Sequence, residues 1–323
     1  PALGGWESTV ARRLHLEVPS TREFFEREGL AYETTDTMAE LYEHVAGEVL
    51  ASSKPQGPLN LVYTVPKKAV LAHSDEARAW VQEEWERVLA RRGREGLATI
   101  VDLSELTVRG SRLYHGERRI HAVIYGGGNH FAGKHLWPAY KAGGFSLFNG
   151  PLEDLLTDKR NLALLSERAA EGRLSAEDAR AVERYIPWSR IPGDGETILP
   201  DGSRGPLLPY LLAHRGELIL KEPSSFAAKG VVAGWAASDD EWRRAVERAA
   251  AEGDWVVQRR VRSLPVLFQV GDSGCAAHEV IWGPFLFGER YAGILLRMQP
   301  ETMGDVVSVG RTGASAGFVA EVA

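Results

Sequence analysis

The segment LILKEPSSFAAKGVVAG, residues 218–234, decides how the second half of this chain is interpreted. An apolar run ends at Lys221, a loop of small residues follows, and Lys229-Gly230 leads into a second apolar run. Loops of Ser, Ala and Gly let backbone N–H groups approach phosphate oxygens closely, and lysine adds positive charge without demanding bidentate geometry. The segment therefore predicts two strands joined by a polyphosphate-covering loop. An ordinary hairpin with exposed lysines is the alternative.

Three other segments carry groups that suit a nucleotide. WVVQRRV (255–261) is an apolar run that contains Gln258, whose amide, with neighbouring backbone groups, offers the donor and acceptor that an adenine edge needs. AGILLRM (292–298) puts Arg297 at the end of an apolar strand, where a guanidinium can clamp a phosphate or a carboxylate. LLTDKRNLALL presents Asp158-Lys159 on a predicted helix.

The first part of the chain alternates predicted helices and strands. LNLVYTV (59–65) and LATIVDL (97–103) are strand candidates, and the helix predicted at 74–93 lies between them. Two more helices are expected at 20–30, opened by a Ser/Thr cap, and at 36–50. This β–α–β order predicts a parallel, doubly wound α/β lobe.

The middle of the chain is more varied. Residues 107–125 predict a hairpin followed by a buried strand, and 143–150 predict another strand. Residues 151–170 and 175–186 have the apolar spacing of two helices. The Pro/Gly-rich segment 187–206 is interpreted as a linker or mobile loop.

The last third of the chain predicts an α+β lobe of successive antiparallel strands. One capped helix is expected at 238–253. Strands are expected at 217–223, 229–235, 254–261, 265–270, 279–287, 291–298 and 305–310.

Composition narrows the class of protein. The 323 residues are 44% hydrophobic and 25% charged, as in an ordinary globular chain, and the net charge of −6 argues against a nucleic-acid partner. A single cysteine, Cys275, has no internal disulfide partner, which fits a reducing, cytoplasmic compartment. No apolar run approaches the roughly 18–20 residues that span a bilayer, so no membrane partner is expected.

In this order, five runs resemble the circularly permuted ATP-grasp proteins, of which glutathionylspermidine synthetase is a distant relative: FNGPLEDLLTDKRNLALLSE, IPWSRI, LILKEPSSFAAKGVVAGW, WVVQRRV and FLFGERYAGILLRM. The resemblance covers roughly residues 145–310. It implies that 146–323 forms the ATP-grasp lobes, with 215–262 as the nucleotide-covering subdomain. Residues 55–145 would form an α/β pre-ATP-grasp lobe, and 1–54 an N-terminal helical segment whose start contributes to the permuted lobe.

The resemblance also implies roles for individual residues. Lys159 and Lys221 match the two lysines that approach the ATP phosphates, and the loop 224–230 matches the one that covers them. Gln258 matches the adenine hinge, and Arg297 the catalytic arginine near the γ-phosphate. The ATP-binding residues so implied are Lys159, Lys221, Ser224, Ser225, Lys229, Gly230 and Gln258.

The chain departs from the family pattern at YGGGN (125–129), where relatives commonly carry arginines. A glycine-rich loop at this point is a candidate contact for a different acceptor substrate. The candidate substrate residues are Gly127, Gly128 and Asn129.

The implied activity is an ATP-dependent carboxylate–amine ligase, which forms an amide or peptide bond through an acyl phosphate and releases ADP and phosphate. ATP and Mg²⁺ are the expected cofactors, and a small-molecule or peptide carboxylate and an amine are the expected substrates. The oligomeric state is left open. The alternatives are an ATP-grasp phosphotransferase and a nucleotide-binding relative without catalysis.

The metal ligands are not identified by the sequence. The opening PALGGWE resembles the segment that directly follows the family's metal-binding Glu-x-Asn, so the ligands are expected upstream of Pro1. Glu279, at the head of EVIWGPFLF, is the alternative within the chain. Cys275 and His278 could be imagined as nucleophile and base, but the neighbouring small residues predict a loop with a free thiol.

Overall fold

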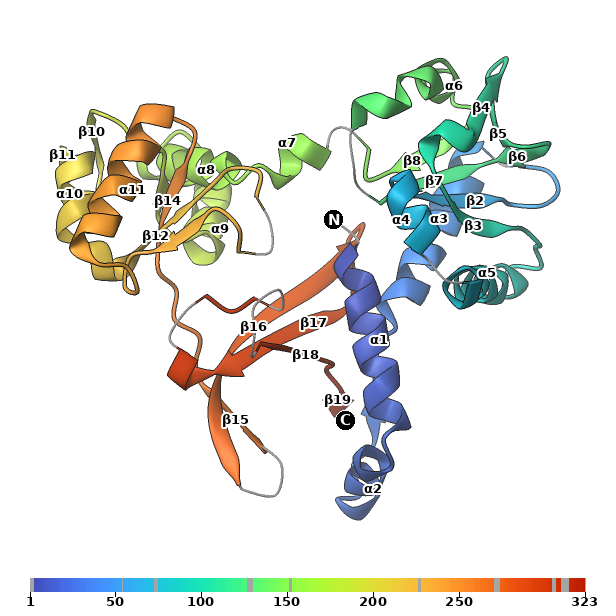
Figure 1. The fold of residues 1–323 in the computed structure, drawn as a ribbon, viewed down its shortest axis with the longest axis horizontal. Coiled ribbons are helices and arrows are strands. Elements are labelled where there is room, and N and C mark those ends of the chain that lie inside the picture. Colours follow the sequence, from blue (N-terminus) through green and yellow to red (C-terminus); the bar gives the residue numbers. More distant parts are fainter. Residues whose placement is uncertain are drawn as a thin grey trace. The chain divides into compact units, whose positions relative to one another are not determined.

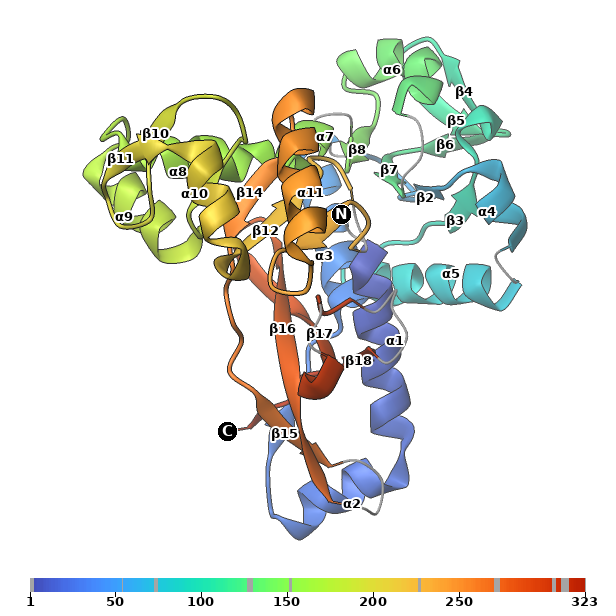
Figure 2. The same cartoon turned by 60° about the vertical axis from the view of Figure 1, so that its left-hand side comes forward.

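The computed structural model forms two compact units, and each is described by itself (Figures 1 and 2). The first comprises Pro1–Glu153, Trp282–Leu296 and Ala316–Ala323, and the second comprises Asp154–Ile281 and Arg297–Ser315. The residues whose structure is described are 3–53, 55–72, 75–126, 130–150, 153–225, 228–269, 274–303, 306–308 and 314–322.

A parallel four-stranded sheet organises the first unit (Figure 1). Its order is β3 (Ala98–Val101), β2 (Leu61–Thr64), β7 (Ala122–Tyr125) and β8 (Ser146–Phe148), and all three pairings are parallel. Every residue of β2 and β7 is buried, as expected for central strands covered on both faces. The predicted parallel α/β lobe is confirmed.

Helices α3 (Thr37–Ser53) and α5 (Asp75–Ala90) pack on each other beside this sheet. Leu41, Val45 and Val49, spaced four residues apart on α3, are all buried. Trp85 of α5 is fully buried and donates its indole N–H to the carbonyl oxygen of Leu59 at 2.9 Å. The shorter helix α4 (Lys67–Ala72) follows β2.

The chain begins with helices α1 (Leu3–Glu17) and α2 (Pro19–Arg27). The prediction of a Ser/Thr cap at 20–30 is wrong. Val18 is the residue before the first turn of α2 and makes no side-chain capping bond, while Pro19 opens the helix. Proline suits this position because its fixed φ is helical and its missing N–H would lack an intrahelical partner anyway.

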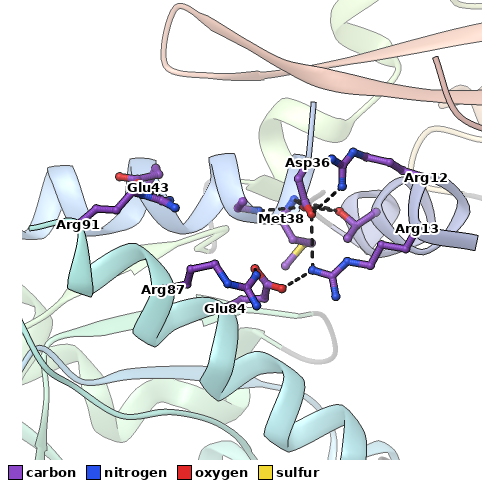
Figure 3. A network of polar contacts seen from close by, with 10 residues as sticks. Arg12, Arg13, Asp36, Met38, Glu43, Glu84, Arg87 and Arg91 are labelled. Atoms are coloured by element: carbon purple, nitrogen blue, oxygen red, sulfur yellow. Dashed lines mark hydrogen bonds and ion pairs between the residues drawn. The ribbon is translucent and has the colours of Figure 1, made fainter. Parts of the chain in front are cut away.

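A buried carboxylate of α5 pairs with an arginine of α1 (Figure 3). Glu84 of α5 is 1% exposed, forms an ion pair with Arg13 of α1, and forms a second at 2.6 Å with Arg87 of its own helix. Arg13 also lies 3.6 Å from Asp36 and 4.7 Å from the centre of the Trp80 ring. Two cations therefore compensate a carboxylate that has been removed from water.

A second, antiparallel sheet contains β4 (Leu106–Arg109), β5 (Arg112–His115) and β6 (Arg118–Ile120). The predicted hairpin is confirmed, and Gly110 in its turn has a φ of +60°, which glycine adopts without strain. The run after this hairpin was expected to be one buried strand. It divides into β6 and β7, which belong to different sheets. Short helices η1 (Leu103–Glu105), η2 (His130–Leu136) and α6 (Trp137–Lys141) complete this part.

The second unit contains an antiparallel sheet of four strands. Its order is β13 (Val231–Ala233), β12 (Leu218–Lys221), β14 (Val256–Arg259) and β9 (Ser189–Arg190). Helices α10 (Leu207–Ala213) and α11 (Asp239–Glu252) pack on it through a buried cluster that includes Trp242 and Trp255. The capped helix predicted at 238–253 is confirmed, with a capping box at its start and Gly253 in the left-handed conformation at its end.

The single helix predicted at 151–170 is wrong, because the described residues form α7 (Glu153–Thr157) and α8 (Arg160–Ala170). The break lies at Asp158-Lys159. The Asp158 carboxylate accepts a hydrogen bond of 2.9 Å from the backbone N–H of Arg160 and pairs with its guanidinium, which starts a new helix. Lys159 thus precedes α8, and the next helix, α9 (Ala176–Tyr185), agrees with the prediction at 175–186.

The interpretation of 187–206 as a linker or mobile loop is also wrong. This segment contains β9 and a hairpin of β10 (Glu196–Ile198) and β11 (Arg204–Pro206). Arg190, 2% exposed, donates to Thr197 Oγ1 at 2.6 Å and to the carbonyl oxygen of Ile198 at 2.7 Å. The many Gly and Pro residues led to the prediction of a loop. The buried Arg190 guanidinium instead links β9 to the β10–β11 hairpin.

The last strands form a sheet in the order β15 (Val266–Gln269), β16 (Cys275–Phe287), β17 (Arg290–Pro300) and β18 (Ser315–Gly317). Cys275 and His278 lie in β16, so the predicted loop is wrong there. Of the strand expected at 305–310, the described residues 306–308 form no strand. A short pair, β1 (Tyr32–Glu33) with β19 (Glu321–Val322), and turns η3 (Arg215–Glu217) and η4 (Glu301–Met303) complete the elements.

The strand pairings confirm a mixed fold class, α/β in the first unit and α+β in the second. No helix in the part of the chain that the structure describes is both long and apolar enough to cross a membrane.

Candidate functional site

A cavity of about 440 Å³ lies in the second unit. It gathers most of the residues that the sequence nominated from four separate segments: Lys159, Lys221, Ser225, Lys229, Gln258 and Arg297. Ser224 and Gly230 belong to the adjoining loop but do not line the cavity. Gly127, Gly128 and Asn129 lie outside the described residues, so their proposed contact with a substrate stays a prediction.

Strand β12 delivers Lys221 to the cavity. Its backbone lies opposite Val231 of β13 and Val256 of β14, and its ammonium donates a hydrogen bond of 2.7 Å to Gln258 Oε1. Burial, together with the nearby charge of Lys159, lowers the pKa of Lys221 below its usual value. An anionic ligand in the cavity would raise the pKa of Lys221 again, because a nearby negative charge stabilises the charged form of the amine.

Gln258 has partners that the sequence did not suggest. Its side chain is 7% exposed, and besides accepting from Lys221 it donates from Nε2 to Ser189 Oγ at 3.0 Å. The amide is therefore bonded to protein groups at both ends. Recognition of an adenine edge at Gln258 and its neighbouring backbone stays a prediction.

Lys159 binds the start of the loop 224–230, of which Ser225, Ala228 and Lys229 line the cavity. Its backbone N–H donates to the carbonyl oxygen of Pro223 at 3.0 Å. Its ammonium donates to the same oxygen at 3.3 Å and to the carbonyl oxygen of Ser225 at 2.5 Å. Burial lowers the pKa of Lys159, opposed by the carboxylates of Asp158 and Glu222. One lysine thus contributes charge to the cavity and order to the loop.

The two ends of this loop meet at Glu222 and Gly230. The backbone N–H of Glu222 donates to the Gly230 carbonyl oxygen at 2.8 Å. Gly230 has a φ of +58°, and a Cβ there would lie 2.2 Å from Glu222 Oε2. Glycine adopts this backbone conformation without strain, and a larger residue would require the Glu222 side chain to move.

The charge of the cavity is strongly positive. Its cations come from β12, β14, β17, the covering loop and the residues around them: Lys159, Lys221, Lys229, Arg259, Arg260 and Arg297. Against these stands the carboxylate of Glu279 on β16. A concave surface lined by one sign of charge focuses the field and concentrates ions of opposite sign. The cavity is therefore suited to a polyanion.

Some lining residues were not identified from the sequence. The guanidinium of Arg260 lies 4.0 Å from the centre of the Trp235 ring, and both residues line the cavity. In the sequence, Trp235 is the last residue of a predicted strand and Arg260 is one of two adjacent arginines. No local pattern therefore marked either residue as part of a site. Apolar side chains complete the lining: Ile219, Val231, Val261, Ile281, Val306 and Val307. Apolar walls with a few polar groups are typical of small-molecule sites.

The described residues of the cavity offer few protein ligands to a metal ion. Within the described residues, no group of three or more His, Cys, Asp or Glu side chains could hold a metal ion. Glu279 nevertheless supplies one carboxylate to the cavity. Mg²⁺ commonly uses one or two carboxylates and takes its other ligands from substrate phosphates and water. The residues present therefore fit a Mg²⁺ that is bound largely through a phosphate ligand.

No protein-family model and no curated protein matches the sequence. Among solved structures, the chain is similar to the ATP-grasp ligase PsnB complexed with a minimal precursor (14% identity, 75% of this chain and 76% of that one, TM-score 0.36). It is also similar to D-alanyl-alanine synthetase A from Vibrio cholerae (12% identity, 72% and 69%, TM-score 0.34). A third is an ATP-grasp RimK domain protein from Sphaerobacter thermophilus (14% identity, 81% and 90%, TM-score 0.34). Similarities at this level of identity and TM-score assign no function to this chain.

Proposed function

We propose that the chain is an ATP-grasp carboxylate–amine ligase and that its second unit binds ATP. The observation that carries this proposal is the convergence of Lys159, Lys221, Lys229 and Arg297 on one cavity, which Ser225 and Ala228 of the small-residue loop also line. The order of sequence motifs that resembles the permuted ATP-grasp proteins supports the same assignment.

The cavity is lined by both charged and apolar side chains, which suit the phosphates and the base of a nucleotide. Lysines at the covering loop and at the end of β12 can neutralise a triphosphate. Val261 and Ile219 offer apolar surface, and the backbone after β14 offers donors and acceptors for a base. The base would then lie along the segment after Gln258, and the phosphates beneath the loop 224–230.

The proposed reaction activates a carboxylate that is otherwise a poor acyl donor. A carboxylate oxygen attacks the γ-phosphorus of ATP, the bond to the β–γ bridging oxygen breaks, and ADP leaves. An amine then attacks the acyl phosphate carbon, loses a proton and expels inorganic phosphate, which leaves an amide. No covalent bond to the protein is required, so the protein contributes position and charge.

Three cationic residues of the cavity have roles in this scheme. Lys221 and Lys159 hold the phosphates, and Arg297 stabilises the charge that develops on the transferring phosphoryl group. The covering loop keeps water away from the acyl phosphate, which would otherwise hydrolyse. Mg²⁺, when bound, would neutralise phosphate charge, with Glu279 as the protein group that holds it.

Transfer of an oxygen isotope tests the reaction. The protein is incubated with ATP, Mg²⁺, a panel of amines and carboxylates labelled with ¹⁸O, and turnover is detected as ADP. The acyl phosphate route moves one ¹⁸O from the carboxylate to inorganic phosphate. Label in AMP would exclude this mechanism. ADP formation without any dependence on an amine would indicate a phosphotransferase, and ATP binding without turnover of any pair would indicate a non-catalytic relative.

A further inference from the structure

A continuous chain of hydrogen bonds leads from the cavity into the core of the second unit. Lys221 Nζ donates to Gln258 Oε1 at 2.7 Å, and Gln258 Nε2 donates to Ser189 Oγ at 3.0 Å. The Ser189 hydroxyl in turn donates to the carbonyl oxygen of Pro187 at 2.7 Å. The chain connects β12, β14 and β9, which lie side by side in one sheet.

The protons of this chain fix the direction of the amide. A serine hydroxyl has one proton, and Ser189 gives it to Pro187, whose carbonyl oxygen can only accept. Toward Gln258 the hydroxyl can therefore only accept, and the amide group that donates is Nε2. Oε1 must then point the other way, toward Lys221. Lys221 can only donate and Ser189 here can only accept, so the two residues select the same amide orientation, and Ser189 anchors its Nε2 end.

Ser189 is itself held rigidly. It is fully buried, and its backbone N–H donates to Ser166 Oγ at 3.1 Å. Ser166 also accepts from Arg190 Nη1 at 3.0 Å, and the same nitrogen donates to the carbonyl oxygen of Ser189 at 2.8 Å. Ser189 therefore has little freedom to change its hydrogen-bonding role.

We propose that Ser189 is a positioning residue for Lys221: by fixing the Gln258 amide, it presents Oε1 to the ammonium and keeps Lys221 charged and aimed for an anionic ligand. The ligand is the ATP phosphate of the proposed function, on which this part of the inference rests. Ser189 does not line the cavity, so it acts only through Gln258.

The electrostatics explain why Lys221 needs this acceptor. Burial and Lys159 both disfavour the charged form and lower the pKa of Lys221. The other charged groups of the cavity are cations apart from Glu279: Lys159, Lys229, Arg259, Arg260 and Arg297. A hydrogen bond from the ammonium to a fixed amide oxygen favours the charged form. Without the bond from Nε2 to Ser189, the amide is held at one end only and can rotate away from the ammonium, which weakens this support.

The test compares Ser189→Ala with Ser166→Ala. Both replace a buried hydroxyl by hydrogen, and both loosen β9, but only the first removes the acceptor for Gln258. Competitive acetylation across pH, read by mass spectrometry at the Lys221 peptide, gives the titration midpoint of this amine. The expected result is a midpoint lower by up to about one pH unit in Ser189→Ala, because an unanchored amide oxygen supports the ammonium less well. Ser166→Ala loosens Ser189 but keeps its hydroxyl, so a smaller shift is expected.

ATP affinity provides the second measurement. The dissociation constant of ATP·Mg²⁺, by calorimetry, should weaken about tenfold in Ser189→Ala, since the lost contact is to a charged group, and the weakening should grow as pH rises. Ser166→Ala should change it less than about twofold. Because a charge effect is titratable and general loosening is not, this pH dependence separates positioning from a merely structural role.

An unchanged Lys221 midpoint in Ser189→Ala, or equal shifts in both variants, would overturn the proposal. A shifted midpoint in a chain that binds no ATP would sustain the role of Ser189 and overturn the proposed function instead. If Ser189→Ala does not fold, Ser189→Cys keeps the shape and replaces the oxygen by a weak acceptor. The same downward shift is expected, and its absence would count against the proposal.

Discussion

The ammonium of Lys159 lies 2.5 Å from the carbonyl oxygen of Ser225, so the residue before α8 holds the loop 224–230. A backbone carbonyl that accepts from a partly buried ammonium contributes more than a neutral hydrogen bond. Lys159 is therefore placed to influence the loop even before any ligand binds.

Lys159→Met should loosen this loop and weaken ATP binding at least tenfold, since a charge-assisted contact is typically worth about 2 kcal/mol. Hydrogen exchange of the loop peptides and calorimetry with ATP·Mg²⁺ measure the two effects. Lys141→Met, on exposed α6, is the matched control and should change neither. Loop exchange that is identical in Lys159→Met and the parent would mean that the loop is ordered without this lysine.

Much of the fold could be predicted from the sequence because its signals are local. Apolar spacing identified α3, α5, α9 and α11, and the β–α–β order identified the parallel sheet. The failures have long-range causes. Segment 187–206 contains Gly and Pro at many positions, yet Arg190 orders it through bonds to Thr197 and Ile198 that no local pattern reveals.

Six of the nominated residues line one cavity, while the contacts among them were not predicted. Lys159, Lys221 and Arg297 were nominated from separate segments, and the cavity brings them together. The Ser189 contact could not be foreseen, because Ser189 and Gln258 are 69 residues apart and only the pairing of β9 with β14 makes them neighbours. Side-chain partners across a sheet depend on register, which the sequence did not specify.

Arg13 and Arg87 should differ in their effect on stability although both pair with Glu84. The Arg87 side chain is 56% exposed, so Arg87→Met should cost less than about 1 kcal/mol of unfolding free energy. The Arg13 side chain is 32% exposed, and its loss also removes the contacts with Asp36 and Trp80. Because it weakens the compensation of a buried carboxylate, Arg13→Met should cost about 3 kcal/mol.

Urea unfolding, followed by tryptophan fluorescence and by hydrogen exchange in α5, provides the comparison. Each arginine substitution in a Glu84→Gln background is the control: a neutral amide needs no cation, so the difference between the two costs should shrink to what the contacts of Arg13 with Asp36 and Trp80 contribute. Equal costs in the Glu84 background would contradict the idea that burial decides the value of each pair.

His121 should make the stability of the first unit depend on pH. It is 5% exposed, and its Nδ1 accepts from the backbone N–H of Asn60 at 3.1 Å. Burial, with the charge of Arg119, lowers the pKa of His121 to about 4, against about 6.5 in an unfolded chain. Between these values the unfolded state binds more protons, so the unfolding free energy should rise from pH 4 to about pH 6.5 and then level off.

The measurement is hydrogen exchange of β2 and β7 amides at a series of pH values, corrected for intrinsic exchange. His121→Asn keeps an acceptor near the position of Nδ1 and removes the titration, so its protection should vary less with pH in this range. A parent and variant with the same slope would assign the pH dependence to other groups.

Arg297 should act on the reacting phosphoryl group more than on ATP affinity. It lies on β17 and lines the same cavity as Lys221 of β12 and Lys229. In the proposed reaction, charge on the transferring group changes between the bound and transition states, and a guanidinium with two parallel donors can follow that change. Arg297→Lys keeps the charge and loses the bidentate geometry.

The expected result is a kcat lowered by about 100-fold, with the ATP dissociation constant changed by less than about threefold, a loss typical of a contact made in the transition state. Single-turnover ADP formation gives the chemical step, and calorimetry gives the affinity. Arg243→Lys, the same substitution on an exposed face of α11, controls for the chemistry of the change. An unchanged kcat with weakened ATP binding would instead assign Arg297 to ground-state affinity. A contact that is equally strong in the bound and transition states changes how much ATP is bound but not the rate of the chemical step.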